Sequence, residues 1–599
     1  MKQIRTLADL FLATAKHDRA ACLMHKVGGA YVAISTRELV SRVRSLAREL
    51  ERAGIRQGDR VALMAENGPH WPTVDFATQV LGAVLVPVYP TLLPEGAAYI
   101  ARDSGSRFLF IQGSDRLDGL LALRGEMPAV ERLIAIDAPA RPGVATLESM
   151  IETGAAPAAT APPGDAWLEE HCRRARPGDL ATLIYTSGTT GDPKGVMLTH
   201  DNLISNIVTN AEILGVENDH VALSFLPLSH SFERTVDYVY FLAGATIAYA
   251  ESVQTVAQNL REVRPHVFVA VPRVYEKVMA RVVEGATAAG GIKSRLFRWA
   301  LRIGKESVPD RLAGRAVGWK TRLADRLVFS KIRERLGGRF RYALSGGAPL
   351  AQEVAEFFWG AGLPVYEGYG LTETSPVISV NVPGAVKLGT VGRPIPGVEV
   401  RIADDGEILS RGRNTMRGYF GKPEATAEVL AADGWFHTGD IGHLDADGFL
   451  VITDRKKEII VNAYGKNIAP APIENALKMS RWIAQAVVVG DQRQFLAALL
   501  VPDFEVVQAW ARGRSLELST AALLAHPELR RTIAGEIEIV NSRLARYEQI
   551  REWELLAADF TIEGGELTPK MSVKRRVIAT KYKQILDRIF APSEGEKER

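Results

Sequence analysis

The sequence predicts an α/β fold: a large N-terminal domain of layered sheets with helices, plus a small C-terminal α/β domain. At 599 residues the chain exceeds what one hydrophobic core organises, so a large body and a smaller domain are expected. Short apolar runs of strand length alternate with segments of helical spacing, which is typical of sheets that carry helices. A dense run of Ser, Thr, Gly and Lys at residues 185–196 indicates where a ligand binds.

The N-terminal part shows this alternation most clearly. Leu39, Val43, Leu46 and Leu50 recur at helical spacing, which predicts a surface helix over residues 36–53. A second helix is predicted over residues 74–81. Apolar runs predict strands at residues 60–65, 84–89, 108–112 and 133–136. Residues 153–165 are rich in Ala and Pro and are predicted to form a surface linker.

The stretch YTSGTTGDPKGV, residues 185–196, is predicted to be a phosphate-binding loop between a strand at 180–185 and a helix that begins near Thr199. Glycines lack the Cβ atoms that would keep backbone N–H groups away from a phosphate, and hydroxyl groups add donors. Lys194 offers a mobile positive charge, and Pro193 stiffens the turn. The glycine and hydroxyl residues of the loop are Thr186, Ser187, Gly188, Thr189, Thr190, Gly191 and Gly195.

The spacing excludes two common nucleotide loops. The Gly-Lys-Ser or Gly-Lys-Thr of a Walker loop does not follow Gly188, and no G-x-G-x-x-G follows a strand. The stretch instead resembles the signature loop of the acyl-adenylate-forming ligases, the family of acyl-CoA synthetases, peptide-synthetase adenylation domains and luciferases. The resemblance implies that this loop binds ATP.

The composition is that of an ordinary soluble globular protein, with 47% hydrophobic and 24% charged residues and a net charge of +3. Cys22 and Cys172 form neither a C-x-x-C pair nor a disulfide framework, which favours a reducing cytoplasm and disfavours zinc. The first 20 residues lack an uninterrupted apolar run, so no secretory signal is expected. Residues 73–93 contain Asp75 and Gln79 and are broken by prolines, so no transmembrane helix is expected.

A second element, FLPLSHSFER at residues 225–234, is predicted to be a proline-interrupted apolar strand that delivers His230 into a turn. A lone histidine is more often structural than catalytic. The element resembles one of the long-chain acyl-CoA synthetases, in which the histidine lies between the nucleotide and the acyl pocket. That resemblance implies that His230 lines the carboxylate site.

Residues 293–341 form a basic segment with fifteen Lys or Arg and four Asp or Glu, a local balance of plus eleven. Leu296, Trp299 and Leu301 interleave with the charges. Two interpretations stay open: a solvated helix face, or a basic amphipathic face that touches anionic lipid. Nucleic acid is disfavoured because no recognition module accompanies the charge.

Two glycine-rich stretches, LSGGAPL (344–350) and YEGYGLTET (366–374), are predicted to be turns after short strands at 341–344 and 363–366. Taken alone, both fit ordinary β-turns. The resemblance implies that the first lines the adenine pocket with Gly346, Gly347 and Ala348, and that the second contributes Glu367, Gly368, Tyr369 and Gly370. It further implies that Tyr369 stacks on adenine, that Thr372 meets phosphate, and that Glu373 holds Mg²⁺ together with Thr186. Oxygen ligands suit that hard cation.

The next stretch, GWFHTGDIG at residues 434–442, contains Asp440, which is assigned to the two ribose hydroxyls because a carboxylate can accept two hydrogen bonds. Residues 454–461, DRKKEIIV, also fit a plain charged turn. The resemblance implies an inter-domain hinge at Asp454 and a second ribose contact at Arg455. The predicted domains are therefore residues 1–453, with the ATP and acyl sites, and a mobile domain of residues 454–599.

The predicted C-terminal domain begins with YGKNIAPAPIE, residues 464–474, which leads into a helix. In the resembled family the tunnel for the thiol acceptor follows this loop, so Gly465, Lys466 and Asn467 are expected to flank the pantetheine arm of coenzyme A. Strands are predicted at 487–489 and 495–501, followed by helices over 504–547. The polar tail, residues 592–599, is predicted to be disordered.

The resemblance implies a reaction in two halves, with ATP, Mg²⁺ and coenzyme A. A fatty acid carboxylate attacks the α-phosphate of ATP and releases pyrophosphate, and the thiol of coenzyme A then displaces AMP. The 225–234 element, the basic segment and the helical extension resemble the long-chain acyl-CoA synthetase branch.

Alternatives are a fatty acyl-AMP ligase that serves a carrier protein, which the 464–467 loop disfavours, and a binding protein with impaired turnover. The protein is expected to be cytoplasmic. Binding to the inner face of a membrane and formation of a homodimer are both left open. Acyl-chain length and pathway cannot be read from the sequence.

The segment GELTPKMSVKRR, residues 565–576, departs from the family pattern. Ser572 occupies the position of the lysine that grips the substrate carboxylate and α-phosphate during adenylation. If the segment is extended, Lys570, Ser572 and Lys574 point to one side. Lys570 is favoured as the substitute and Lys574 is the second candidate; the alternative is that neither substitutes.

Overall fold

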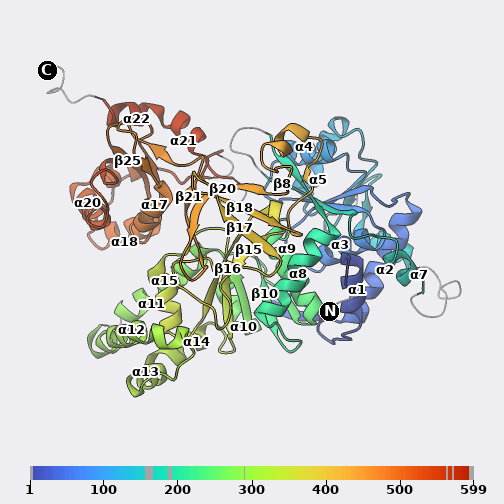
Figure 1. Cartoon of the computed structure of the whole chain (residues 1–599), viewed down its shortest axis with the longest axis horizontal. Helices are drawn as coiled ribbons and strands as arrows, with labels where there is room; N and C mark the ends of the chain where they lie inside the picture. The colour runs from blue at the N-terminus through green and yellow to red at the C-terminus, as the bar shows by residue number, and fades with distance from the viewer. Residues whose placement is uncertain are drawn as a thin grey trace. The chain divides into compact units, whose positions relative to one another are not determined.

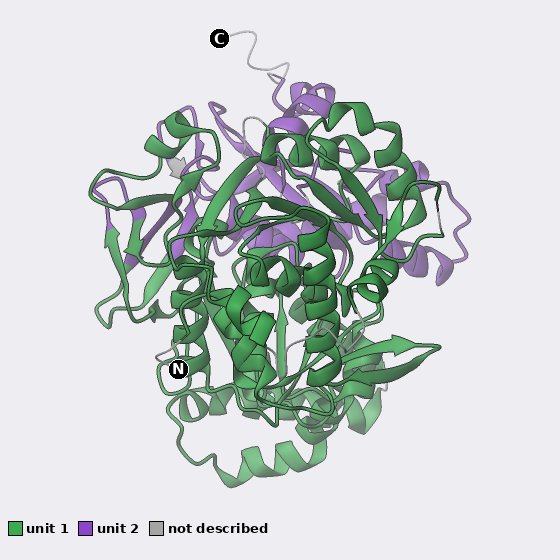
Figure 2. Ribbon diagram, turned by 90° about the vertical axis from the view of Figure 1, so that its right-hand side faces the viewer, with its two compact units in different colours: residues 1–401, 409–438, 444–451 green, residues 402–408, 439–443, 452–599 purple. Residues whose placement is uncertain are grey.

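The computed structural model describes residues 4–139, 141–155, 166–186, 192–288, 290–561, 564–568 and 573–591. The chain folds as two units (Figure 2). Unit 1 comprises residues 1–401, 409–438 and 444–451, and unit 2 comprises residues 402–408, 439–443 and 452–599. The hinge at Asp454 stays a prediction.

A nine-stranded sheet organises one half of unit 1, in the order β16-β15-β14-β13-β12-β10-β11-β1-β2. The six strands from β14 to β1 in that order pair in parallel, and the outer strands pair antiparallel. The strands are β1 Leu23–Val27, β2 Ala30–Ile34, β10 Val221–Ser224, β11 Thr246–Tyr249, β12 Val267–Ala270, β13 Tyr342–Ser345, β14 Val365–Gly370, β15 Val377–Val380 and β16 Arg393–Pro394.

An eight-stranded sheet organises the other half, in the order β19-β9-β8-β4-β3-β5-β6-β7. Its strands are β3 Arg60–Met64, β4 Val84–Val88, β5 Phe108–Ile111, β6 Arg132–Ala135, β7 Ala145–Thr146, β8 Leu180–Thr186, β9 Lys194–Thr199 and β19 Gly418–Tyr419. The predicted strands at 60–65, 84–89, 108–112 and 133–136 are confirmed with small shifts at their ends. Their near-continuous apolar runs are buried because parallel strands are covered on both faces.

Helices cover both sheets (Figure 1). They are α1 Leu7–Ala15, α2 Thr36–Arg52, α3 His70–Val80, α4 Pro94–Ser104, α5 Ser114–Ala122, α6 Leu147–Gly154, α7 Ala166–Cys172, α8 His200–Leu214, α9 Ser231–Ala243, α10 Val256–Val263, α11 Pro272–Ala288, α12 Gly291–Leu312, α13 Trp319–Ala324, α14 Ser330–Arg335, α15 Gln352–Gly360 and α16 Pro423–Ala427, with short helical turns η1 Arg124–Glu126, η3 Asp325–Phe329 and η4 Thr372–Thr374.

Helix α3 is buried almost all round, as expected of a central helix. Its Phe76 lies 4.9 Å from Phe11 of α1 and 5.1 Å from Phe241 of α9, measured between ring centroids. The helix begins four residues before the predicted start. Pro72 does not prevent this, because it stands in the first turn, where a backbone N–H has no partner within the helix. This aromatic core fixes α9 against the rest of unit 1.

Unit 2 contains a small α/β body, as predicted. Strands β24 Ile483–Val489 and β25 Leu496–Pro502 pair antiparallel, and β26 Ile550–Leu555 pairs parallel to β25. Alternate residues of β25 enter two separate apolar clusters, one with Leu500 and Ile533, the other with Leu499 and Ile578. This period of two shows that both faces of the sheet are covered.

The remaining strands form a four-stranded sheet, in the order β17-β18-β20-β21, and a two-stranded pair, β22-β23. They are β17 Val398–Ile402, β18 Glu407–Gly412, β20 Phe436–Leu444, β21 Leu450–Arg455, β22 Ile460–Val461 and β23 Asn467–Ile468. The helices of unit 2 are α17 Pro470–Lys478, α18 Phe504–Arg512, α19 Thr520–Ala525, α20 Pro527–Asn541, α21 Arg575–Lys581 and α22 Lys583–Ile589. Within the described residues, no helix combines the length and apolar character needed to cross a membrane.

Two predicted segments fall wholly or mostly outside the described residues. These are the linker at 153–165, of which residues 156–165 are not described, and the tail at 592–599.

Candidate active site

The predicted phosphate loop joins two paired strands. β8 and β9 run antiparallel, and Thr186 lies directly opposite Lys194. After β9 the chain enters α8, where Thr199 and Asn202 form a capping box, so the predicted helix start is confirmed. Five loop residues lie outside the described part of the chain: Ser187, Gly188, Thr189, Thr190 and Gly191.

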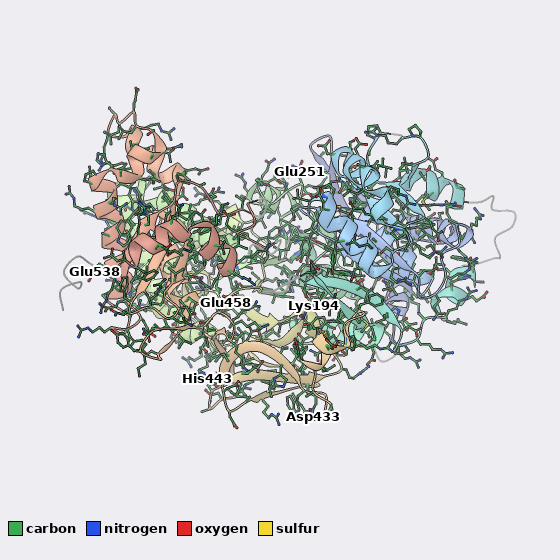
Figure 3. All side chains as sticks on the ribbon, turned by 90° about the horizontal axis from the view of Figure 1, so that it is seen from above. Lys194, Glu251, Asp433, His443, Glu458 and Glu538 are labelled. Carbon is green, nitrogen blue, oxygen red and sulfur yellow. The ribbon has the colours of Figure 1, made fainter. Side chains whose placement is uncertain are left out.

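Lys194, labelled in Figure 3, is the first residue of β9. It lies beside an aromatic residue that the sequence analysis missed. Its Nζ is 5.1 Å from the ring centroid of Tyr419, which belongs to β19, the strand paired with β9. The Tyr419 hydroxyl donates to Oε1 of Glu373 at 3.0 Å. Burial, aided by the Glu373 carboxylate, raises the pKa of Tyr419 well above its usual range, so the hydroxyl keeps its proton.

Glu373 is the predicted metal ligand, and its surroundings fit that role. The side chain is 9% exposed and sits on η4, which contacts β9. Oε1 of Glu373 accepts the hydrogen bond from Tyr419, and none of the described residues forms a hydrogen bond to Oε2 of Glu373. A carboxylate oxygen and a threonine hydroxyl are hard donors, so Glu373 and Thr186 would suit Mg²⁺.

Thr372, the predicted phosphate contact, links this group to the histidine element. Its Oγ1 lies 3.2 Å from Oγ of Ser231, the residue after His230. Both hydroxyl side chains are buried. Lys194, Tyr419 and Glu373 are therefore linked by side-chain contacts. A second contact joins Thr372, next to Glu373 in the chain, to Ser231, next to His230.

The predicted proline-interrupted strand before His230 is wrong, but the predicted turn is confirmed, because His230 N donates to Pro227 O at 2.9 Å. β10 ends at Ser224, and His230 is the N-cap of α9. The backbone between them bonds to a side chain instead of a neighbouring strand: Asn67 donates to Leu226 O at 2.8 Å and accepts from Leu228 N at 3.1 Å. Nδ1 of His230 accepts from Phe232 N at 3.0 Å, which leaves the proton of the neutral ring on Nε2.

Arg234, in the same element, is a buried residue whose role the sequence analysis did not identify. Its guanidinium bonds both oxygens of Asp75 on α3, at 2.8 and 2.9 Å, and Thr182 of β8 at 2.8 Å. It therefore joins α9 to β8, the strand that leads into the predicted phosphate loop. The place of Arg234 with Glu233 and Asp237 beside a run of aromatic and aliphatic residues was the signal that could have indicated its role.

The two glycine-rich stretches meet at the ends of neighbouring parallel strands, the usual place for a ligand in such sheets. Ser345 of β13 lies opposite Glu367 of β14, so Gly346, Gly347 and Ala348 follow directly beside Glu367. A Cβ on Gly346 would lie 2.9 Å from the Phe232 ring of α9. The predicted adenine residues are thus adjacent to the histidine element.

The predicted turn at 366–374 is corrected in its first half, because residues up to Gly370 continue β14. A Cβ on Gly370 would overlap the backbone oxygen of Pro376, and one on Gly368 would lie 3.3 Å from Val380. These glycines allow β15 to approach rather than forming a turn. Burial raises the pKa of Glu367 from 4.5 to about 8, and Tyr369 beyond it is half-buried.

In unit 2, the two predicted ribose residues are neighbours. Oδ1 of Asp440 lies 3.1 Å from Nε of Arg455, and Asp440 is 4% exposed. The predicted hinge residue Asp454 accepts from Arg455 N at 2.6 Å. Burial raises the pKa of Asp454 to about 6.

The predicted coenzyme A loop lies between the paired strands β22 and β23. Oδ1 of Asn462, which the sequence analysis missed, accepts from Tyr464 N at 3.0 Å and from Lys466 N at 2.9 Å. Gly465 has a φ of +72°, which favours glycine. Asn467 is the first residue of β23.

The two candidate lysines near the C-terminus differ in what the structure describes. Lys570 lies outside the described residues, as does Ser572. Lys574 is the N-cap of α21, and its N–H donates to Glu566 O at 2.7 Å. Because residues 569–572 lie outside the described residues, the expectation that this segment is extended stays a prediction. Next to Lys574, Arg575 forms two hydrogen bonds with Glu474, at 2.7 and 2.9 Å.

Comparison with known proteins adds to this geometry. A family described as AMP-binding enzyme matches residues 12–420, and its C-terminal domain matches residues 457–594. The long-chain-fatty-acid–CoA ligase FadD15 of Mycobacterium bovis is 38% identical over 577 residues, 94% of this chain and 93% of that protein. The long-chain-fatty-acid–CoA ligase ACSBG1 of Bos taurus is 32% identical, over 99% of this chain and 86% of that protein.

Among solved structures, the adenylation domain of a carboxylate reductase from Mycobacterium chelonae superposes with a TM-score of 0.78 at 24% identity. The match covers 98% of this chain and 91% of that chain. At this identity the likeness shows the fold alone.

Proposed function

The chain belongs to the AMP-binding enzyme family, and from that premise we propose that it is an AMP-forming ligase that joins a long-chain fatty acid to coenzyme A. The observation that carries the proposal is the contact of Lys194 with Tyr419 and of Tyr419 with Glu373, together with the contact of Thr372, next to Glu373, with Ser231, next to His230. It brings a cation for phosphates and a histidine for a carboxylate into one unit.

In the first half-reaction, a carboxylate oxygen of the fatty acid attacks the α-phosphorus of ATP, and the bond to pyrophosphate breaks. Lys194 compensates charge on the phosphates, His230 orients the carboxylate, and Tyr369 packs against adenine. Mg²⁺, when bound by Glu373 and Thr186, would neutralise phosphate charge. In the second half, the thiol sulfur of coenzyme A attacks the acyl carbon, and AMP leaves.

Asp440 and Arg455 are proposed to bind the ribose, and Gly465, Lys466 and Asn467 to flank the pantetheine arm. Cys22 and Cys172 are buried and unpaired, which supports a reducing, cytoplasmic location. We propose in addition a weak contact between residues 293–341 and the anionic inner face of a membrane. Ion pairs among the described residues hold five of the fifteen basic side chains there: Arg302, Lys305, Arg315, Arg333 and Arg341.

The test is an assay with ATP, Mg²⁺ and a panel of fatty acids, with and without coenzyme A. The expected products are AMP, pyrophosphate and the acyl-CoA thioester. ADP and orthophosphate as direct products would contradict the proposal. Acyl-AMP that accumulates and is not transferred to coenzyme A would favour the second candidate, a ligase that serves a carrier protein.

A further inference from the structure

The basic segment folds as a group of helices between β12 and β13: α12, α13, η3 and α14 (Figure 1). Two glycines bring α12 against α15, since a Cβ on Gly360 would lie 2.9 Å from the backbone of Gly304. This close crossing places Arg311, in the last turn of α12, beside Gly362, which follows α15.

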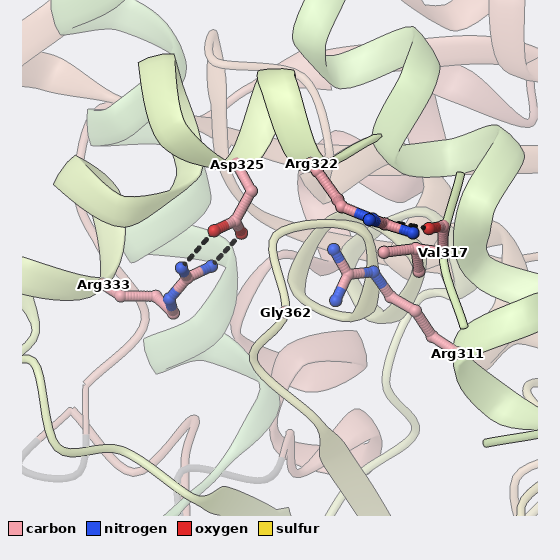
Figure 4. Close-up of a pocket in the computed structure, with 6 residues that line it drawn as sticks. All are labelled: Arg311, Val317, Arg322, Asp325, Arg333 and Gly362. Carbon is pink, nitrogen blue, oxygen red and sulfur yellow. Dashed lines mark hydrogen bonds and ion pairs between the residues drawn. The ribbon is translucent and has the colours of Figure 1, made fainter. Parts of the chain in front are cut away.

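A cavity of about 330 Å³ opens among these helices (Figure 4). It is lined by Arg311, Val317, Arg322, Asp325, Arg333 and Gly362. The three arginines come from α12, α13 and α14, so the tertiary packing gathers them. A cavity of this size lies in the range of about 300–1,000 Å³ that is typical of small-ligand sites.

The charges that line this cavity do not balance. Asp325 pairs with Arg333 through two hydrogen bonds, at 2.6 and 2.8 Å. Arg311 bonds the Ser307 hydroxyl at 3.3 Å and Arg322 bonds Val317 O at 3.2 Å, and neither has an ion pair among the described residues. Three guanidinium groups therefore face one carboxylate.

Two of these guanidinium groups are close together. Nη1 of Arg311 and Nη1 of Arg333 each lie 3.1 Å from the position that a Cβ would take on Gly362, so they are separated by at most twice that distance. Burial and the nearby Arg333 lower the pKa of Arg311. An anion between the groups would relieve this repulsion, and guanidinium N–H groups match phosphate oxygens in geometry.

Exposed apolar side chains accompany the cavity on the same helical stretch. Trp319, Leu323 and Leu327 are 69%, 41% and 38% exposed, and they recur every four residues along α13 and η3. That spacing places them about one helical turn apart. Tryptophan and leucine beside arginine are typical of helices that lie in a membrane interface.

We propose that the cavity formed by Arg311, Arg322 and Arg333 binds the phosphate of an anionic phospholipid headgroup, while Trp319, Leu323 and Leu327 enter the interface. The proposal rests on the membrane contact proposed above and not on the ligase reaction. It assigns the membrane contact to a defined binding site, instead of to the net positive charge of residues 293–341.

The test compares two variants of the full chain that each lose one arginine from the same stretch, Arg322→Gln and Arg326→Gln. Arg322 lines the cavity, whereas Arg326 is exposed and does not. Binding is measured by co-sedimentation with phosphatidylcholine vesicles that contain a quarter phosphatidylglycerol. The expected result is a several-fold loss for Arg322→Gln and a much smaller loss for Arg326→Gln. Equal losses would overturn the site and leave only general electrostatic attraction.

A competition experiment distinguishes lipid from soluble phosphate. Inorganic phosphate should release the wild-type chain from these vesicles more than chloride of the same ionic strength, and this difference should vanish in Arg322→Gln. If phosphate binds the wild-type chain in calorimetry while no vesicle binding occurs, the lipid assignment is wrong. Acyl-CoA synthesis from a soluble fatty acid should persist in Arg322→Gln, so failure of the ligase proposal is seen separately.

Discussion

His230 combines a structural and a chemical role in one side chain. Its Nδ1 caps α9, and the other ring nitrogen carries the proton in the neutral form. Alanine removes both roles, whereas asparagine is itself a good N-cap residue. The pair of substitutions therefore separates helix capping from the chemistry of the ring.

We expect both His230→Ala and His230→Asn to lose thioester formation, by about 100-fold if the ring contributes as general acid–base groups typically do. Only His230→Ala should also lose about 0.5–2 kcal/mol of unfolding free energy, measured in urea, because its cap is gone. Full activity in His230→Asn would show that the residue serves the helix alone.

Burial gives Glu367 a stability effect that depends on pH. Its pKa in the folded chain, about 8, is above the ordinary value of 4.5. The folded state therefore binds more protons than the unfolded state between these values, and the contribution of this group to stability is lost as pH rises from 4.5 to about 8.

The Glu367→Gln variant should not show this loss. Its unfolding free energy relative to wild type is expected to rise across the same pH window and to level off above it, as measured by urea unfolding at several pH values. Glu334→Gln, at an exposed position, is the control and should follow wild type throughout. A difference that does not vary with pH would contradict the assignment.

At the scale of elements, the pairing of β14 with β15 decides the geometry around the predicted adenine residues. The register shifts between Tyr369 and Gly370, and a Cβ on Gly370 would overlap the oxygen of Pro376, the residue before β15. The space for this approach exists because Gly370 has no side chain.

Gly370→Ala is expected to cost about 3 kcal/mol or more, because the added Cβ meets backbone, whereas overpacking against side chains costs about 1–3 kcal/mol. Gly368→Ala is the matched control: its Cβ meets a valine methyl at 3.3 Å, which can shift. Thermal unfolding of the two variants provides the comparison. Similar melting temperatures would mean that β15 can move away without cost.

At the scale of the whole molecule, the two half-reactions are expected to use unit 2 differently. Lys570 is proposed to act in adenylation in place of the family's lysine, whose position Ser572 occupies, while Lys574 is the N-cap of α21. Lys570→Ala should damage pyrophosphate-forming adenylation far more than thioester formation from preformed acyl-AMP. Lys574→Ala serves as the comparison, and wild-type rates for Lys570→Ala in both assays would rule out the role.

The sequence by itself determined the α/β class, the alternation of strands and helices, and the place of the predicted phosphate loop between β8 and β9. These features depend on local patterns: apolar periodicity, glycines and a capping box at Thr199. The predicted strand before His230 and the predicted turn at Gly370 were wrong, because there a distant group decided the backbone conformation. Asn67 bonds the chain before His230, and β15 continues the pairing beyond residue 366.

Only the tertiary structure decided which side chains meet. Tyr419 reaches Glu373 through the pairing of β19 with β9, and Arg234 reaches Asp75 and Thr182 across two elements. The three cavity arginines come from three different helices. Such contacts join residues far apart in the chain, and the free energy that holds them comes from packing and paired charge, which no local pattern encodes.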